Sequence, residues 1–330
     1  MSEAISRNYA AIDVGSNTVR LMIASTKEPG NEFKPIHVAR IITRLGEGFE
    51  IDKTLKEIPA TRTLAALKEF KKLIDLADVQ KKATAGTAVI REAKNKDWFI
   101  EVVRKKTGLP IKVLSGKQEA QLSLKGVFKA VQVQEGPALV LDIGGGSTEM
   151  ILAQPTNPPE IMYIESLPLG VVKLTEKFLQ NDPPGIDACR ELRKEVRNIS
   201  APIIEKIKLL PKQQNTALLP EIMIATAGTP TTLAAVYWEL EKYEPEKITG
   251  TVLNIEWLEK LAIKLANMTL KERQTLRGLE RGREDIILAG LLILIEIMIS
   301  MNFSNVLVSD PGLLEGLIWD LMDSNPVVEW

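Results

Sequence analysis

Two glycine-containing turns hold the residues that could do chemistry on a phosphate group. The first turn contains Asp13, Gly15, Ser16 and Asn17, and the second contains Asp142, Gly144, Gly145, Gly146 and Ser147. Glycine lets backbone N–H groups approach an anion closely, and successive N–H groups in a turn form an anion-binding nest. A carboxylate at the end of each preceding strand could hold a hydrated Mg²⁺ that neutralises phosphate charge. We therefore expect phosphate binding at both turns, with Asp13, Asp142 and the adjacent Glu149 as metal ligands.

The two turns belong to a sequence repeat. Residues 11–24 read AIDVGSNTVRLMIA and residues 140–153 read VLDIGGGSTEMILA, which places Asp142 at an offset of 129 residues from Asp13. A second motif, ATAGT, occurs at 83–87 and again at 225–229, each time before a predicted helix. Either turn alone is also compatible with an ordinary β-hairpin. Two matched motifs in the same order predict a duplicated α/β domain whose two phosphate-type loops face each other.

Glu119 is the candidate general base. It follows Ser115, which with Gln118 forms a predicted capping box, so that Glu119 is expected in the second turn of a helix. Because His37 is the only histidine, carboxylates make up nearly the whole supply of candidate bases. The alternative is a surface glutamate that favours the helix dipole.

Several basic residues could bind phosphate. Arg91 follows the first ATAGT, where its guanidinium could clamp phosphate oxygens in a bidentate way, and Arg44 is a weaker candidate of the same kind. Arg190, Arg193 and Arg197 share one helix face with Lys194. That stripe could carry a polyanion, but pairing with Glu191 and Glu195 on a solvated helix explains it equally well.

Length and composition limit the other possibilities. The 330 residues suit two domains of ordinary size, and 45% hydrophobic with 26% charged residues is typical of a globular protein. The net charge of -1 argues against nucleic acid as a partner. One cysteine, Cys189, and one histidine exclude a disulfide framework and a multi-histidine metal centre within the chain. A P-loop, an Asp-x-Asp nucleophile motif, a Cys-x₅-Arg motif and a G-x-G-x-x-G fingerprint do not occur in the sequence.

The elements that must position these residues alternate between strands and helices. The spacing of apolar residues predicts a helix over 61–78, a strand over 111–114, a helix from 115 to 131 and an amphipathic helix over 313–322. Ile286 to Phe303 is apolar apart from Glu296 and a few small polar residues. A central glutamate disfavours a membrane span, so we expect a buried core helix there. The polar start of the chain has no signal-peptide pattern, which favours a cytoplasmic protein without membrane association.

The motifs as a set resemble the exopolyphosphatase / guanosine pentaphosphate phosphohydrolase (Ppx/GppA) family, which belongs to the superfamily of actin, sugar kinases and the seventy-kilodalton heat-shock chaperones. The resemblance covers nearly the whole chain. The matching segments, in family order, are AIDVGSNTVRLMIA, RLGEG, GTAVIREA, VLSGKQEA, LDIGGGSTEMIL, SLPLGVVKLTE, ATAGTPTTLAA, RGREDIILAG and VSDPGLLEG.

This resemblance implies a fold and a division of roles. The fold would be α/β, with two duplicated ribonuclease H-like domains facing across a cleft. We expect domain I to cover residues 1–124 with the C-terminal helix 308–330, and domain II to cover 125–307. Glu119 would activate water, and Asp142 would be the second catalytic residue. The Asp13 and Asp142 turns and Arg91 would bind the terminal phosphate, and Mg²⁺ would be the cofactor. The substrate would be inorganic polyphosphate or pppGpp, and a homodimer is plausible from the family.

The sequence departs from the family pattern at three positions. Gln118 replaces the first glutamate of SGxEEA, which leaves the second, Glu119, intact. Pro311 and Leu314 replace two arginines of the closing motif VSDRGLREG, so binding of a long chain or a nucleotide could be weaker. Two alternatives to hydrolysis stay open: a non-hydrolytic regulatory protein that binds ppGpp, and a phosphotransferase acting as a kinase.

Overall fold

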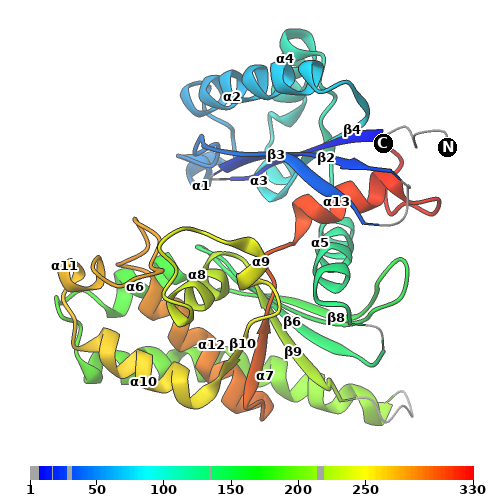
Figure 1. The fold of residues 1–330 in the computed structure, drawn as a ribbon. Helices are drawn as coiled ribbons and strands as arrows, with labels where there is room; N and C mark the ends of the chain where they lie inside the picture. The colour runs from blue at the N-terminus through cyan, green and yellow to red at the C-terminus, as the bar shows by residue number, and fades with distance from the viewer. Residues whose placement is uncertain (1–6, 17, 28–31, 134, 214–218) are drawn as a thin grey trace. The chain divides into compact units, whose positions relative to one another are not determined.

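The computed structural model describes residues 7–16, 18–27, 32–133, 135–213 and 219–330 (Figure 1). The chain forms two compact units. Unit 1 contains residues 1–126 and 312–330, and unit 2 contains residues 127–311. The divisions predicted from the sequence lie after residues 124 and 307.

Unit 1 is built on a five-stranded mixed sheet. Its order is β3-β2-β1-β4-β5, in which β1, β2 and β3 pair antiparallel while β1, β4 and β5 run parallel. The strands are β1 Arg7–Val14, β2 Thr18–Thr26, β3 Lys34–Ile42, β4 Val79–Gly86 and β5 Lys112–Val113. The predicted strand over 111–114 is therefore confirmed as a two-residue strand.

Unit 2 repeats this sheet with one strand added. Its order is β10-β11-β9-β6-β7-β8, where β6, β7 and β8 pair antiparallel, β6, β9 and β11 run parallel, and β10 adds an antiparallel edge. The strands are β6 Ala138–Ile143, β7 Thr148–Gln154, β8 Glu160–Leu167, β9 Ile222–Thr226, β10 Val252–Asn254 and β11 Asn305–Val308. Strand for strand, the first sheet recurs in the second, which confirms the duplication predicted from the repeated motifs.

Helices cover both faces of the unit 1 sheet. Apolar residues of alternating strand positions pack on α2 Glu57–Leu76 and α4 Lys96–Thr107 on one face, and on α13 Leu313–Met322 on the other (Figure 1). The bounds of α13 are those predicted. Most of its residues are buried, so it is a core helix and does not have the exposed polar face of the predicted amphipathic helix. The remaining helices of this part of the chain are α1 Phe49–Asp52, α3 Ala88–Glu92 and α5 Gly116–Val131.

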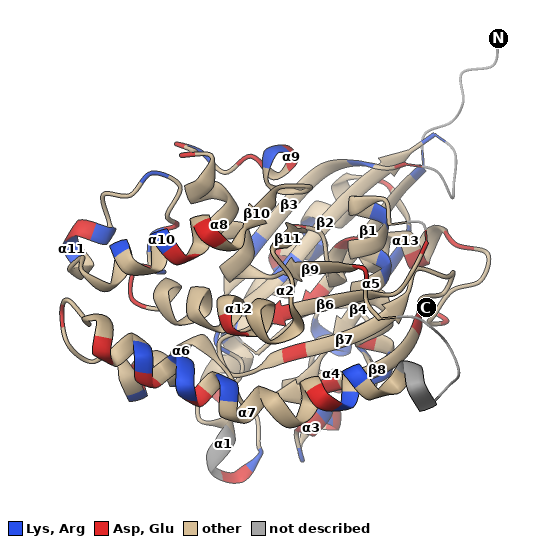
Figure 2. Ribbon diagram, turned by 90° about the horizontal axis from the view of Figure 1, so that it is seen from below, with Lys and Arg blue, Asp and Glu red and all other residues tan. Residues whose placement is uncertain are grey.

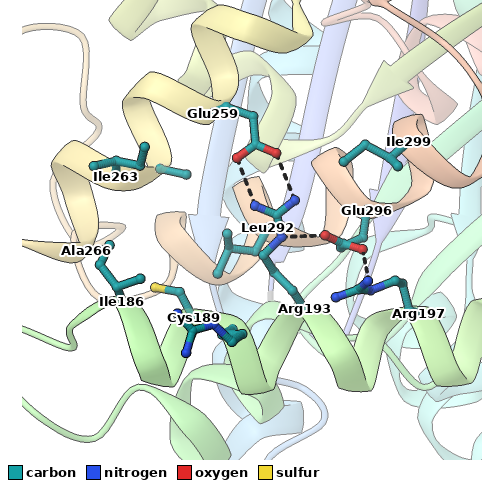
Figure 3. A pocket seen from close by; sticks show the side chains of 12 residues that line it. Ile186, Cys189, Arg193, Arg197, Glu259, Ile263, Ala266, Leu292, Glu296 and Ile299 are labelled. Carbon is teal, nitrogen blue, oxygen red and sulfur yellow. Dashed lines mark hydrogen bonds and ion pairs between the residues drawn. The ribbon is translucent and has the colours of Figure 1, made fainter.

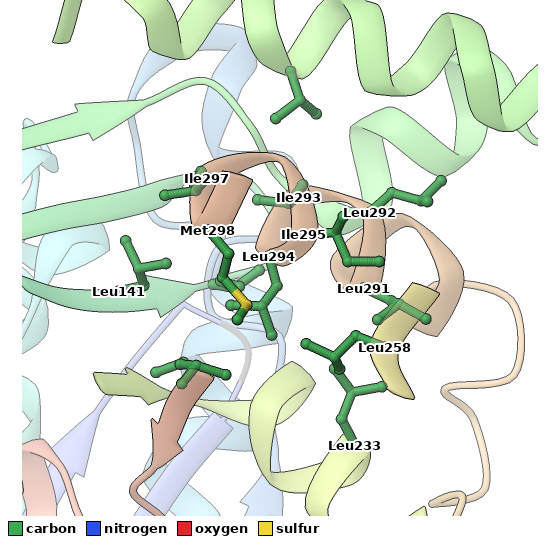
Figure 4. Packing of buried hydrophobic residues seen from close by; sticks show 14 of the residues in the cluster. Leu141, Leu233, Leu258, Leu291, Leu292, Ile293, Leu294, Ile295, Ile297 and Met298 are labelled. Atoms are coloured by element: carbon green, nitrogen blue, oxygen red, sulfur yellow. The ribbon is translucent and has the colours of Figure 1, made fainter. Parts of the chain in front are cut away.

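The core of unit 2 surrounds α12 Ile287–Met301, the segment that the sequence predicted as a buried helix. All but two of its residues are buried, and its side chains pack between Leu141 of β6, Leu233 and Leu258 (Figure 4). Among the described residues, no helix is both long and apolar enough to span a bilayer. The other helices are α6 Val171–Phe178, α7 Ile186–Gln213, α8 Gly228–Tyr237, α9 Pro245–Ile248, α10 Ile255–Ala266 and α11 Leu270–Arg273.

Helices α5 and α13 touch through glycine, and this contact gives a stability prediction. A Cβ at Gly316 would lie 1.8 Å from the carbonyl oxygen of Leu122, so Gly316→Ala must push the helices apart. We expect the free energy of unfolding in urea to fall by about 3 kcal/mol. The control is Gly116→Ala, because no heavy atom lies within 4 Å of that Cβ, and a change under about 1 kcal/mol is expected. Equal stability of the two variants would contradict the observed packing.

Candidate active site

Three parallel strands of unit 1 end at one edge of the sheet, and the predicted site residues of this unit follow them. Asp13 lies near the end of β1, Arg91 lies in α3, which follows β4, and Glu119 comes shortly after β5. In α/β sheets, ligands bind outside the carboxyl ends of parallel strands. The topology therefore brings these predicted residues to the edge where a binding site is expected.

Asp13 is buried and only half satisfied. Its Oδ2 accepts hydrogen bonds from Arg20 Nη2 at 2.7 Å and Arg20 Nε at 3.0 Å, across the antiparallel register that places the two residues opposite each other. Its Oδ1 is buried and has no hydrogen-bond partner among the described residues. A buried carboxylate oxygen without a partner is costly. This oxygen fits a role in holding a cation or a cation-bound water.

The turn after Asp13 is held by its own backbone and by the segment 44–48. Gly15 N donates to Thr18 O at 3.1 Å, and Gly46 N donates to Ser16 O at 2.8 Å. A Cβ at Gly46 would lie 3.3 Å from Ser16 Cβ, so the close approach suits glycine. The RLGEG motif thus supports the turn through Gly46. Asn17, a predicted phosphate ligand, lies outside the described residues.

Arg91 and Glu119, both predicted site residues, contact each other. Arg91 Nη1 donates to Glu119 Oε2 at 2.7 Å and to the Leu114 carbonyl at 3.0 Å, and both side chains are about 30% exposed. In the described part of the chain, Nη1 makes all the side-chain hydrogen bonds found for Arg91. Its Nε and Nη2 are therefore donors still available to phosphate oxygens.

The local backbone explains how this pair is positioned. Thr87 N donates to Val14 O and Arg91 N donates to Thr87 O, so α3 is fixed directly to the end of β1. The predicted capping box is confirmed, since Ser115 N donates to Gln118 Oε1 at 3.0 Å and Gln118 N donates to Ser115 Oγ at 3.2 Å. Because α5 begins at Gly116, Glu119 lies in its first turn and not in the second as predicted. A carboxylate is favoured in that position by the helix dipole.

The second glycine turn repeats the geometry of the first. Asp142 lies opposite Glu149 in the β6–β7 register, as Asp13 lies opposite Arg20, and Gly144 N donates to Ser147 O at 2.9 Å. Val171 N donates to Gly144 O and Val172 N donates to Gly145 O, both at 3.1 Å. The start of α6 therefore fixes the peptide groups of the triple glycine.

Gly170 makes that support possible. A Cβ at this position would lie 2.3 Å from Gly145 O and 2.4 Å from Gly146 Cα, so only glycine fits against the turn. Gly170 belongs to the matching segment SLPLGVVKLTE, and no role was predicted for it from the sequence. The motif marked this position in the sequence. The role of Gly170 depends on how α6 packs against the turn, which the sequence alone does not give.

Two serines hold Glu149. Ser147 Oγ and Ser166 Oγ both donate to Glu149 Oε1 at 2.7 Å, and Ser166 lies opposite Glu149 in the β7–β8 register. These bonds fix the carboxylate through one oxygen. Ser147 was predicted to bind phosphate, but its contact with Glu149 was not predicted. Ser166 was not predicted as a site residue, because strand register cannot be derived from the sequence.

The donor chemistry fits Mg²⁺. Over the described residues, no group of three or more His, Cys, Asp or Glu side chains could form a metal cage. Magnesium seldom uses such a cage, because it keeps several waters and takes one or two carboxylates together with substrate phosphates. Asp13, whose Oδ1 has no partner within the described part of the chain, and the Asp142–Glu149 pair supply ligands of this kind within their own units.

The second ATAGT motif leads into α8 with a strained backbone. Ala227 has φ 74° and ψ −168°, a conformation that is normally open to glycine alone. The next residue, Gly228, lies against the Arg283 guanidinium, whose Nη1 would be 2.1 Å from a Cβ at that position. Strain of this kind is concentrated at functional sites. Arg283 belongs to the matching segment RGREDIILAG, and no role was predicted for it from the sequence.

The basic residues on one face of α7 were interpreted either as a polyanion-binding stripe or as a solvated face paired with Glu191 and Glu195, and the structure differs from both interpretations. Arg193 pairs with Glu259 and Glu296, and Arg197 pairs with Glu296, so these guanidinium groups are tied to α10 and α12. Glu195 pairs with Lys177 of α6 and not with an arginine of its own helix. Figure 2 shows basic and acidic residues interleaved along α7. The stripe is therefore largely part of the packing between helices.

Comparison with known proteins places these features in a wider group. The model of the Ppx/GppA phosphatase family matches residues 22–325. The chain is 33% identical to the bifunctional 3-dehydroquinate synthase/phosphatase of Fusobacterium nucleatum, over 94% of this chain and 46% of that protein, so it spans about half that relative's length. It is 28% identical to exopolyphosphatase 2 of Mycobacterium tuberculosis, over 94% of this chain and 98% of that protein.

A solved structure shares the whole architecture. The crystal structure of the Aquifex aeolicus member of the Ppx/GppA protein family matches with a TM-score of 0.82 and 30% identity, covering 96% of this chain and 97% of that one. With the two sheets described above, this likeness confirms the predicted fold class of duplicated ribonuclease H-like domains of the actin superfamily.

Proposed function

The chain belongs to the Ppx/GppA phosphatase family, and from that premise we propose that it is an exopolyphosphatase, which releases orthophosphate from the end of inorganic polyphosphate. The observation that carries the proposal is the Arg91–Glu119 pair at the strand edge that also holds the Asp13 turn. A carboxylate fixed by a guanidinium at this edge is suited to take a proton from water. The only histidine in the sequence, His37, lies on the edge strand β3.

In the proposed reaction, Glu119 accepts a proton from a water molecule as the water oxygen attacks the terminal phosphorus. The bond between that phosphorus and the bridging oxygen breaks, and the shortened chain leaves with the bridging oxygen. The backbone N–H groups of the glycine turns and the free donors of Arg91 bind the charge that develops on the phosphoryl oxygens. The hydrogen bond that Arg91 Nη1 donates to Glu119 Oε2 holds this carboxylate in place.

We propose Mg²⁺ as the cofactor, held by Asp13, Asp142 and Glu149. When bound, it would neutralise phosphate charge and orient the terminal group. Two observations support this assignment: Asp13 Oδ1 is buried without a partner among the residues that the structure describes, and two serines fix the carboxylate of Glu149. The remaining ligands would be water and phosphate oxygens, as is usual for this ion.

The substrate is tested by measuring phosphate release side by side on short polyphosphate, long polyphosphate and pppGpp. We expect the highest kcat/KM on polyphosphate. Leu314 is buried in the unit 1 core, so the position that carries arginine in the family pattern is a packing position here. Faster release from pppGpp would instead make the chain a pppGpp phosphohydrolase, and tight ppGpp binding without release from any substrate would make it a regulatory protein. ATP formation from polyphosphate and ADP would reveal a kinase.

Ser166→Ala tests how Glu149 is positioned. Loss of one of the two hydrogen bonds to Oε1 should loosen the carboxylate, and removal of such a supporting partner lowers metal affinity about 10–100-fold. We expect the Mn²⁺ dissociation constant, measured by electron paramagnetic resonance with Mn²⁺ as probe, to rise by about tenfold. Ser166→Thr keeps the hydroxyl and should restore most of the affinity. Unchanged Mn²⁺ binding in Ser166→Ala would remove Glu149 from the proposed metal site.

A further inference from the structure

Unit 2 contains a pocket that the proposed reaction does not use. It has a volume of about 340 Å³ and lies between α7, α10 and α12 (Figure 3). This size falls at the lower end of the range for small-molecule sites, about 300–1,000 Å³. Its lining comes from side chains of these three helices, and none of them belongs to the glycine turns.

The floor of the pocket is a network of four charges. Arg193 donates from Nη1 and Nη2 to the two oxygens of Glu259, each at 2.8 Å, and from Nε to Glu296. Arg197 Nε lies 3.0 Å from the second oxygen of Glu296 (Figure 3). With Arg190, which also lines the pocket, the lining carries one more positive than negative charge.

This network is an unusual feature of a hydrophobic core. Glu296 is 2% exposed and is the only charged residue of α12, whose other residues are apolar apart from Ser300. A buried ion pair contributes little net stability, and an apolar replacement is often neutral or stabilising. Stability alone therefore does not account for a glutamate at this position. Its partners present guanidinium groups to a cavity, which is where a ligand would use them.

Exposed aliphatic side chains surround the charged floor. Ile186, Ile263 and Ile299 line the pocket, and they are 43%, 57% and 49% exposed. Large apolar side chains that gather in this way around a concave surface indicate a binding site. Arg190 and Arg197 also line the pocket, and their side chains are 68% and 56% exposed. Each of them uses one nitrogen in its ion pair with Asp187 or Glu296.

We propose that this pocket binds a small organic monoanion with an aliphatic body, such as a medium-chain carboxylate. The carboxylate would be held by Arg190 and Arg197, and the chain would cover the three isoleucines. A polyanion does not fit, because Glu259 and Glu296 neutralise most of the positive charge of the lining. The pocket takes no part in phosphate release, so this proposal can be tested separately from the proposed function.

The test is binding of sodium octanoate to the full chain, measured by isothermal titration calorimetry. We expect saturable binding at one site, weakened at least tenfold in Arg190→Glu and in Ile263→Asp. Both positions are exposed, so both variants should keep the wild-type melting temperature within a few degrees. The matched controls are Arg104→Glu and Ile58→Asp, exposed positions in unit 1, and these should bind octanoate as the wild type does.

Two competitors decide the ligand class. Neutral 1-octanol should bind at least tenfold more weakly than octanoate, and tripolyphosphate should not displace octanoate. Equal binding of 1-octanol would overturn the role of the arginines, and displacement by tripolyphosphate would make the pocket a polyanion site. Absence of saturable octanoate binding, or equal binding by all four variants, would overturn the proposal outright.

Discussion

Glu119→Gln is expected to lower kcat for phosphate release from long polyphosphate by about 10²- to 10⁴-fold, with KM changed only a few-fold. Glutamine keeps the size of the side chain and can still accept a hydrogen bond from Arg91, but it cannot take a proton from water. The measurement is steady-state phosphate release at saturating Mg²⁺, together with substrate binding by calorimetry. Binding should persist, because the turns proposed to bind phosphate are untouched.

The matched control is Glu101→Gln. Glu101 is also paired with an arginine of unit 1, Arg104, but on the exposed face of α4. Its loss should leave kcat within about twofold, since exposed ion pairs contribute little. If Glu119→Gln releases phosphate at the wild-type rate, Glu119 is not the base and the surface interpretation of this residue is correct.

Gly170→Ala is expected to lower kcat/KM by about 10²-fold although residue 170 carries no functional side chain. Its new Cβ would stand 2.3 Å from Gly145 O, so the triple-glycine turn or the start of α6 must move. A displacement of about 1 Å at a reacting site can cost about 10²-fold in rate. The variant should still melt cooperatively, since the change is local to the turn. The measurement is the kcat/KM ratio for polyphosphate.

Val172→Ala serves as the comparison for this variant. Val172 lies in the same segment and its backbone N–H also binds the turn, at Gly145 O, but its side chain is 41% exposed. Alanine keeps the hydrogen bond and removes two methyl groups from a partly exposed side chain, so kcat/KM should stay within about threefold. Equal loss in both variants would mean that side-chain packing at α6, and not the close backbone approach at Gly170, determines the turn.

Features that depend on local sequence could be predicted. The Asp-x-Gly turns, the Ser115–Gln118 capping box and the helix over 313–322 rest on interactions between residues close in the chain, and the structure has all of them. The core helix around Glu296 was also readable, because an unbroken apolar run with one charge fits a buried helix better than a membrane span.

Features that depend on strand register and helix packing could not be predicted. Ser166 reaches Glu149 only because β8 pairs with β7, and Arg91 meets Glu119 across 28 residues of sequence. Arg193 and Glu296 are 103 residues apart, so the helix-face pattern on α7 suggested solvent or a polyanion where the structure has an ion pair. In each case the sequence supplied the residue type, and the tertiary fold supplied the partner.

The most direct test of the account is hydrolysis of long polyphosphate in H₂¹⁸O, with mass analysis of the products over time. We expect each phosphate released to carry one solvent oxygen, the chain to shorten from its end one unit at a time, and Glu119→Gln to slow the incorporation by about 10²- to 10⁴-fold. Phosphate without solvent oxygen, release of internal fragments, or transfer of the terminal phosphoryl group to ADP in place of water would contradict it.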